Sequence, residues 1–157
     1  IETQPEQSDI LSIPFMRDSL CAIVSYNHPL AEKESVSLAQ LANYPFLMRE
    51  KGSAGREILE ACFSLLQISI HPIWESSSTQ AIVKGVSEEL GVAVLPYLLV
   101  ERDIREKVVK MLPLQQPLHR DLNVIYHKSK YLTPNMTSFI ALCKKYGREN
   151  ETSLPRI

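Results

Sequence analysis

The hydrophobic residues form two kinds of pattern that take turns along the chain. One is a short continuous apolar run, and the other is a segment in which hydrophobic residues recur every three or four positions. The apolar runs at residues 46–48 and 92–95 predict buried strands, and the second predicts a buried parallel one. Helical spacing between them predicts two amphipathic helices, one burying Ile58, Leu59, Cys62, Phe63 and Leu66 and the other Ala81, Ile82, Val86 and Leu90. Because strands and helices alternate, we expect an α/β fold with a largely parallel sheet.

The remaining pattern adds elements on both sides of this segment. Residues 10–15 and 20–25 predict two extended pieces, interrupted by Pro14 and by Arg17 and Asp18. A short helix is expected after the N-cap Ser37, and the helix at 79–90 is expected to end at Gly91. Further strands are predicted at 68–75, 108–114 and 122–127, a short helix at 96–103, and a last helix from Pro134 whose Met136, Phe139, Ile140 and Cys143 share a face.

Two polar turns, residues 51–55 and 76–79, each follow a predicted strand and open a helix. Ser53 takes the N-cap position, and Gly52 and Gly55 would let the backbone approach a ligand closely. The first amides of a helix have no partner within the helix, so such a turn can bind an anion or a polar group. The alternative is that both turns are helix caps with nothing bound.

Composition narrows the class of protein. The chain has 157 residues, 45% of them hydrophobic, and a net charge of -1, so charge alone indicates no nucleic-acid or membrane surface. No apolar run reaches the roughly 18 residues that a membrane span needs, and we expect no signal peptide. The three cysteines are widely spaced within apolar stretches, which favours reduced thiols and no metal site; we expect no cofactor.

Catalysis is not indicated. Ser53 lies in Lys-Gly-Ser-Ala-Gly, which lacks the Gly-x-Ser-x-Gly elbow of serine hydrolases, and no histidine can be assigned to it as a base. Phosphate-binding and dinucleotide-binding fingerprints are also missing. The sequence therefore favours a binding module over an enzyme.

Five stretches in register resemble the effector-binding domain of LysR-type transcriptional regulators. These are Asn27-His28-Pro29-Leu30-Ala31; residues 36–42 with Tyr44-Pro45-Phe46; Gly52-Ser53-Ala54-Gly55-Arg56, similar to the family's Gly-Ser-Gly-Thr-Arg; residues 78–83 through Leu90-Gly91-Val92-Ala93-Val94-Leu95-Pro96; and Tyr126-His127-Lys128 with Tyr131-Leu132-Thr133-Pro134. Together they cover almost the whole chain.

The resemblance implies a type II periplasmic-binding-protein-like fold, with two α/β subdomains and an effector crevice between them. Residues 1–17 would be a remnant of the first subdomain, 18–122 the second, and 123–157 a return strand and helix of the first. The family's N-terminal winged helix-turn-helix is absent, so we expect a fragment of a longer protein. The family implies a small-molecule effector, DNA bound through the missing domain, homo-oligomers in the full-length protein, a cytoplasmic location and no membrane partner.

The resemblance also suggests effector-binding residues. By position these are Gly52, Ser53, Ala54 and Gly55, with Ser77, Ser78 and Thr79 as a second group; no catalytic or metal-binding residue is expected. The chain departs from the family at Ala54 and Gly55, where Gly-Thr is common. Because the threonine hydroxyl is missing, Ser53 becomes the main candidate for a polar contact with the effector. The alternative function is a periplasmic-type solute-binding protein of the same fold.

Overall fold

The computed structural model describes residues 9–150, which divide into two compact units. Residues 9–18 and 119–150 form one, called here the strand–helix unit, and residues 19–118 form the other, called the α/β unit. The boundaries fall inside strand β1 (Ile10–Val24) and near the start of strand β6 (Leu118–His127). Each unit is described by itself.

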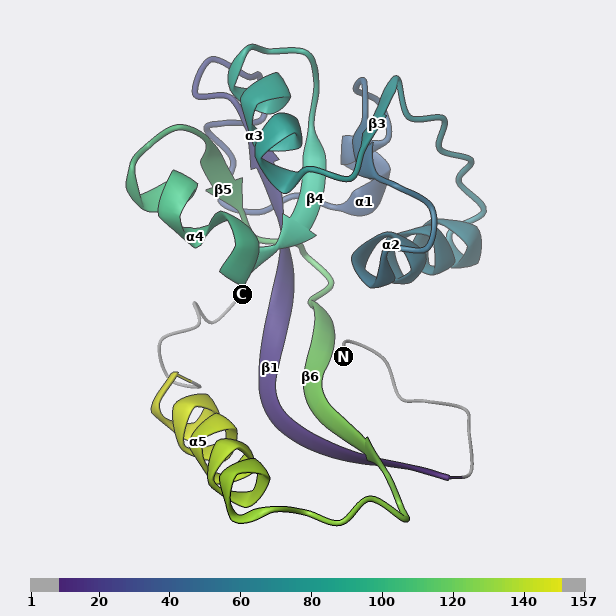
Figure 1. Cartoon of the computed structure of the whole chain (residues 1–157). Helices are drawn as coiled ribbons and strands as arrows, with labels where there is room; N and C mark the ends of the chain where they lie inside the picture. The colour runs from purple at the N-terminus through teal and green to yellow at the C-terminus, as the bar shows by residue number, and fades with distance from the viewer. Residues whose placement is uncertain (1–8, 151–157) are drawn as a thin grey trace. The chain divides into compact units, whose positions relative to one another are not determined.

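The sheet of the α/β unit is built around the second half of β1 (Figure 1). Strand β4 (Ala93–Pro96) pairs with it antiparallel, Cys21 opposite Leu95, and strand β5 (Lys110–Leu112) pairs antiparallel, Ile23 opposite Met111. The prediction of a largely parallel sheet is therefore wrong for β4, which pairs antiparallel with β1. The periodicity of the sequence does not reveal the relative direction of two paired strands. Parallel pairing occurs between β2 (Leu47–Arg49) and β3 (Trp74–Ser76), and in an isolated bridge from Phe46 to Val92.

Helices cover both faces of this sheet, which explains the unbroken apolar runs. Successive strand residues point to opposite faces, so Leu20, Ala22 and Val24 pack in a core with helices α1 (Leu38–Leu41) and α2 (Ala54–Leu65). Cys21 and Ile23 pack on the other face, in a core with α3 (Thr79–Ser87) and α4 (Tyr97–Arg105). A strand buried on both faces has no reason to alternate in polarity.

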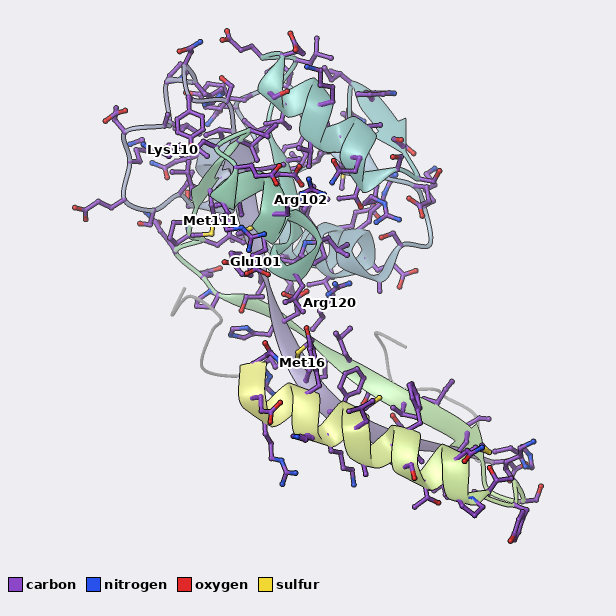
Figure 2. The ribbon with its side chains drawn as sticks, turned by 60° about the vertical axis from the view of Figure 1, so that its left-hand side comes forward. Met16, Glu101, Arg102, Lys110, Met111 and Arg120 are labelled. Carbon is purple, nitrogen blue, oxygen red and sulfur yellow. The ribbon has the colours of Figure 1, made fainter. Side chains whose placement is uncertain are left out.

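In the strand–helix unit, the first half of β1 pairs with β6, and α5 (Pro134–Asn150) follows (Figure 1). Arg120 of β6, labelled in Figure 2, is buried. It donates two hydrogen bonds to the buried Asp18 of β1, at 3.0 and 2.8 Å. Arg17 pairs with Asp121 at 2.9 Å. These partners on β6 explain why polar residues do not split β1 into the two predicted pieces.

Several predicted boundaries are also wrong. Only the end of the predicted strand 68–75 forms β3, and α3 ends at Ser87 rather than Leu90, which is 51% exposed. Glu89, not Gly91, takes the left-handed conformation after α3, at φ 63°. Gly91 instead lies against the Pro45 carbonyl, where a Cβ atom would collide. Leu66, predicted to face the core, is 42% exposed beyond the end of α2. In α5, Met136, Phe139 and Ile140 line one hollow, as expected for residues that share a face, although Phe139 is 59% exposed.

Candidate functional site

The two polar turns lie at the same edge of the parallel β2–β3 pair. Leu47, Met48 and Arg49 stand opposite Trp74, Glu75 and Ser76, so the two strands end side by side. Each strand leads into a turn and then into the first residues of a helix, α2 or α3. Because parallel strands end at the same edge, the two groups of predicted site residues converge there.

The first turn presents an unused hydroxyl. Gly52 has φ 86°, a conformation that other residues adopt at a cost, and its Cβ side is open. Ser53 takes the predicted N-cap position, and its backbone carbonyl accepts a hydrogen bond from the amide of Glu57 at 3.0 Å. Its side chain, however, makes no capping hydrogen bond. Ser53 is half-buried at the start of α2.

Ala54 and Gly55 are placed less favourably for direct contact. Ala54 is half-buried and Gly55 is buried, with Pro96 of β4 on its Cβ side at 3.6 Å. Gly55 therefore packs α2 on β4. The hollow behind the turn, which Ser53, Gly55, Arg56 and Pro96 help to line, holds only about 10 Å³, too little for an effector. A ligand at this turn has to lie on its outer side.

In the second turn, the polar side chains are mostly engaged in the turn itself. The Ser78 hydroxyl accepts from the amide of Ala81 at 3.2 Å and caps α3, while the Ser76 hydroxyl accepts from the amide of Ser78 at 3.1 Å. Ser77 is exposed. Thr79 is half-buried, and its Oγ1 accepts a hydrogen bond from Arg49 at 3.1 Å. Thr79 is thus the predicted residue that joins the second group to the first.

A buried arginine fixes the geometry of this edge. Arg56, 5% exposed, donates from Nη1 to the Arg49 carbonyl at 2.7 Å and pairs with Glu75 of β3 at 2.7 Å and with Glu60 at 2.6 Å. It therefore links α2 to the ends of β2 and β3. The hydrogen bond from Arg56 lowers the pKa of Glu75, and that from Glu75 raises the pKa of Arg56.

Sequence reasoning missed Arg49 and Glu75, because their roles depend on which strands are neighbours. A signal for Arg49 was present: a cation directly after an apolar strand and before a glycine turn. Within residues 9–150, no group of three or more His, Cys, Asp or Glu side chains is placed to hold a metal ion. None of the helices in that range combines the length and apolarity that crossing a bilayer requires.

Comparison with curated proteins finds regulators of transcription. The chain is 28% identical over 145 residues to the HTH-type transcriptional regulator CysL of Bacillus subtilis, covering 92% of this chain and 48% of CysL. It is 33% identical over 137 residues to the HTH-type transcriptional activator CmpR of Synechocystis, covering 87% and 45%. The chain spans about half the length of these relatives. They are regulators and not enzymes, in agreement with the expectation from sequence.

Comparison with solved structures gives the fold. The effector binding domain of QuiR in complex with shikimate matches with a TM-score of 0.82 at 23% identity, over 94% of this chain and 70% of that one. The regulatory domain of CcmR from Synechocystis in complex with 2-PG matches with a TM-score of 0.85 at 24% identity, over 94% and 72%. The predicted type II periplasmic-binding-protein-like fold is confirmed. A family model described as the LysR substrate binding domain matches residues 1–148, and the chain therefore belongs to the LysR substrate binding domain family.

Proposed function

We propose that the chain is the ligand-sensing part of a LysR-type transcriptional regulator. The family match carries this proposal, since it covers residues 1–148 and the curated relatives are transcriptional regulators. Two solved domains of this fold carry shikimate and 2-PG, which supports a small molecule as the ligand here. The alternative, a solute-binding protein, is not favoured, because the relatives regulate transcription.

The effector site we propose is the edge where β2 and β3 end. Ser53 supplies a hydroxyl that does not cap its helix, and the first amides of α2 add donors for a carboxylate or another polar group. Thr79 lies at the same edge. Because Ser78 caps α3 and Gly55 packs on Pro96, they contribute to the shape of the site more than to direct contact.

In the whole regulator, the effector would favour one arrangement of the two subdomains over another. That preference would reach a winged helix-turn-helix through the homo-oligomer and change how it binds DNA in the cytoplasm. The assignment of residues 18–122 to the second subdomain, and of the flanking segments to the first, is part of this proposal.

Calorimetry with an effector found by a thermal-shift screen of the full-length regulator tests the site. Ser53→Phe would place a bulky ring where the ligand binds, and we expect at least tenfold weaker binding, about 1.4 kcal/mol. Ser64→Phe, the same change at an exposed position further along α2, is the control and should bind normally. Equal affinity in both variants, with the melting transition preserved, would place the effector elsewhere.

A further inference from the structure

Arg49 occupies a position that neither the composition nor the family motifs single out. It is the last residue of β2, and its side chain is 20% exposed at the edge where the two polar turns meet. Its backbone carbonyl is held by the buried Arg56. The guanidinium is thus a cation at the end of β2 that contacts Thr79, the first residue of α3.

The guanidinium already binds a carboxylate in the way that it would bind the anionic group of a ligand. Nε and Nη2 donate to the two carboxylate oxygens of Glu50, at 2.9 and 3.0 Å. Nη1 donates to Thr79 at 3.1 Å. A guanidinium fork matches the geometry of a carboxylate or a phosphate, so Glu50 occupies the place that an anionic ligand group would take.

The two sides of this ion pair are held unequally. Arg49 is fixed through its backbone by Arg56 and through Nη1 by Thr79, whereas Glu50 begins the turn and its side chain is 42% exposed. The hydrogen bond from Arg49 lowers the pKa of Glu50, so Glu50 is ionised at neutral pH. A pair exposed to this degree contributes little to the stability of the fold, so a ligand carboxylate or phosphate can replace the Glu50 carboxylate without unfolding the chain.

We propose that Arg49 binds an anionic group of the effector, carboxylate or phosphate, and that Glu50 is the internal carboxylate that occupies the guanidinium until the ligand displaces it. Thr79 holds Nη1 of the guanidinium, and Ser53, whose side chain does not cap α2, belongs to the first turn at the same edge. This inference rests on the proposed function, because it assigns the charge selectivity of that same site to one residue. It predicts that anionic ligands are preferred over neutral analogues of the same shape.

Arg102 offers a matched control. It lies on α4, where Figure 2 labels it. It donates from Nε to Glu106 at 2.8 Å, so it is also an arginine paired through Nε with a glutamate on its own segment. Its side chain is 78% exposed, and it belongs to neither polar turn. Phosphate attracted by any surface arginine would bind at Arg102 as well as at Arg49.

The experiment is a nuclear magnetic resonance titration of the 157-residue chain with inorganic phosphate, following the Nε–H signals of Arg49 and Arg102 and the amide of Ser53. We expect saturable shifts at Arg49 and Ser53, at least tenfold weaker binding in Arg49→Gln, and tighter binding in Glu50→Gln, where the competing charge is gone. Arg49→Lys should be intermediate because it keeps the charge without the fork. Arg102→Gln should bind as the unaltered chain does.

Two results would overturn the inference. One is no saturable shift at Arg49 in the unaltered chain, and the other is unchanged phosphate affinity in Arg49→Gln with its thermal transition preserved. Failure of the proposed function looks different. If Ser53→Phe weakens the binding of a screened effector and Arg49→Gln does not, only the role of Arg49 is wrong. If phosphate binds at Arg49 but Ser53→Phe leaves the affinity for the effector unchanged, the proposed effector site is wrong instead.

Discussion

Ser53 and Ser78 occupy equivalent positions, each the N-cap of a helix at the same edge, and yet they differ in what their hydroxyls do. Ser78 accepts the amide of Ala81, while Ser53 makes no such bond. A capping hydroxyl stabilises a helix by about 0.5–2 kcal/mol, whereas an unused one contributes little. The Ser53 hydroxyl therefore adds little to the stability of α2, which is compatible with the ligand contact proposed for it.

This difference gives a prediction about stability. Ser78→Ala should lower the free energy of unfolding by about 1 kcal/mol, because it removes a capping bond. Ser53→Ala should change the free energy by less than about 0.5 kcal/mol. Urea unfolding followed by circular dichroism measures both, and each variant is the control for the other. Equal losses would mean that the Ser53 hydroxyl caps α2 in solution and is not reserved for a ligand.

For single residues, the sequence predicts the position that a side chain takes in a helix or turn, but not its hydrogen-bond partners far away in the chain. The serine before an amphipathic run predicts an N-cap, and the structure places Ser53 there. The interaction of Arg49 with Thr79 spans 30 residues and depends on β2 and β3 being neighbours, which no local pattern encodes. The residues of the proposed site could therefore be predicted from the sequence, while the position of Arg49 among them could not.

Among the elements, α2 is held to the strand ends by Arg56, whose side chain is 4% exposed, and Glu75, whose side chain is 41% exposed. The hydrogen bond from Arg56 lowers the pKa of Glu75 below its ordinary value of 4.5. A carboxylate with a lowered folded-state pKa binds fewer protons in the folded than in the unfolded protein. Its contribution to stability is therefore complete above pH 4.5 and is lost as the pH falls through the folded value.

We accordingly expect Glu75→Gln to destabilise the chain at neutral pH and to make its stability less sensitive to acid. Urea midpoints measured between about pH 6 and pH 3 should fall less steeply in the variant than in the unaltered chain. Glu88→Gln is a suitable comparison, because Glu88 also has a lowered pKa, caused by Lys84, but both partners are exposed. An equally steep fall with and without Glu75 would show that the pair with Arg56 does not hold this edge.

Element types were predicted from the sequence more readily than their pairing. The buried run at 20–24 and the helices α2 and α3 follow from periodicity alone. The continuity of β1 did not, because Asp18 and Arg17 are satisfied by Arg120 and Asp121, about a hundred residues away in the chain. Long-range partners of this kind decide whether a charged residue ends a strand or lies inside it.

At the scale of the whole molecule, the two units differ in how well their apolar residues are covered. Both faces of the sheet in the α/β unit are packed, and the five residues 20–24 are fully buried. In α5 the only buried residue is Gly147, which lies against the Phe15 carbonyl. Local stability follows burial, so the units should not unfold with equal ease.

Amide hydrogen exchange should reveal this difference. The amides of residues 20–24 should exchange most slowly, and those in the middle of α5 several orders of magnitude faster, because opening α5 exposes little new apolar surface. Phe139→Ser should leave the exchange of the slow group unchanged. Slow exchange in α5 matching that of β1 would show that the helix is covered by something else in solution.

The exposed residues of α5 also bear on self-association. Phe139, Leu142 and Tyr146 are 59, 62 and 53% exposed and recur at helical spacing, so they form one apolar stripe. Three side chains cannot bury the roughly 1,200 Å² of a stable interface, so we expect weak association that rises with concentration. Sedimentation velocity should show mainly monomer at low micromolar concentration, and a Phe139→Ser, Leu142→Ser double variant should lose the residual association. Leu99→Ser, which changes an exposed leucine of α4, is the control and should keep the residual association. A tight dimer that persists on dilution and survives the double variant would mean that the chain associates through another surface.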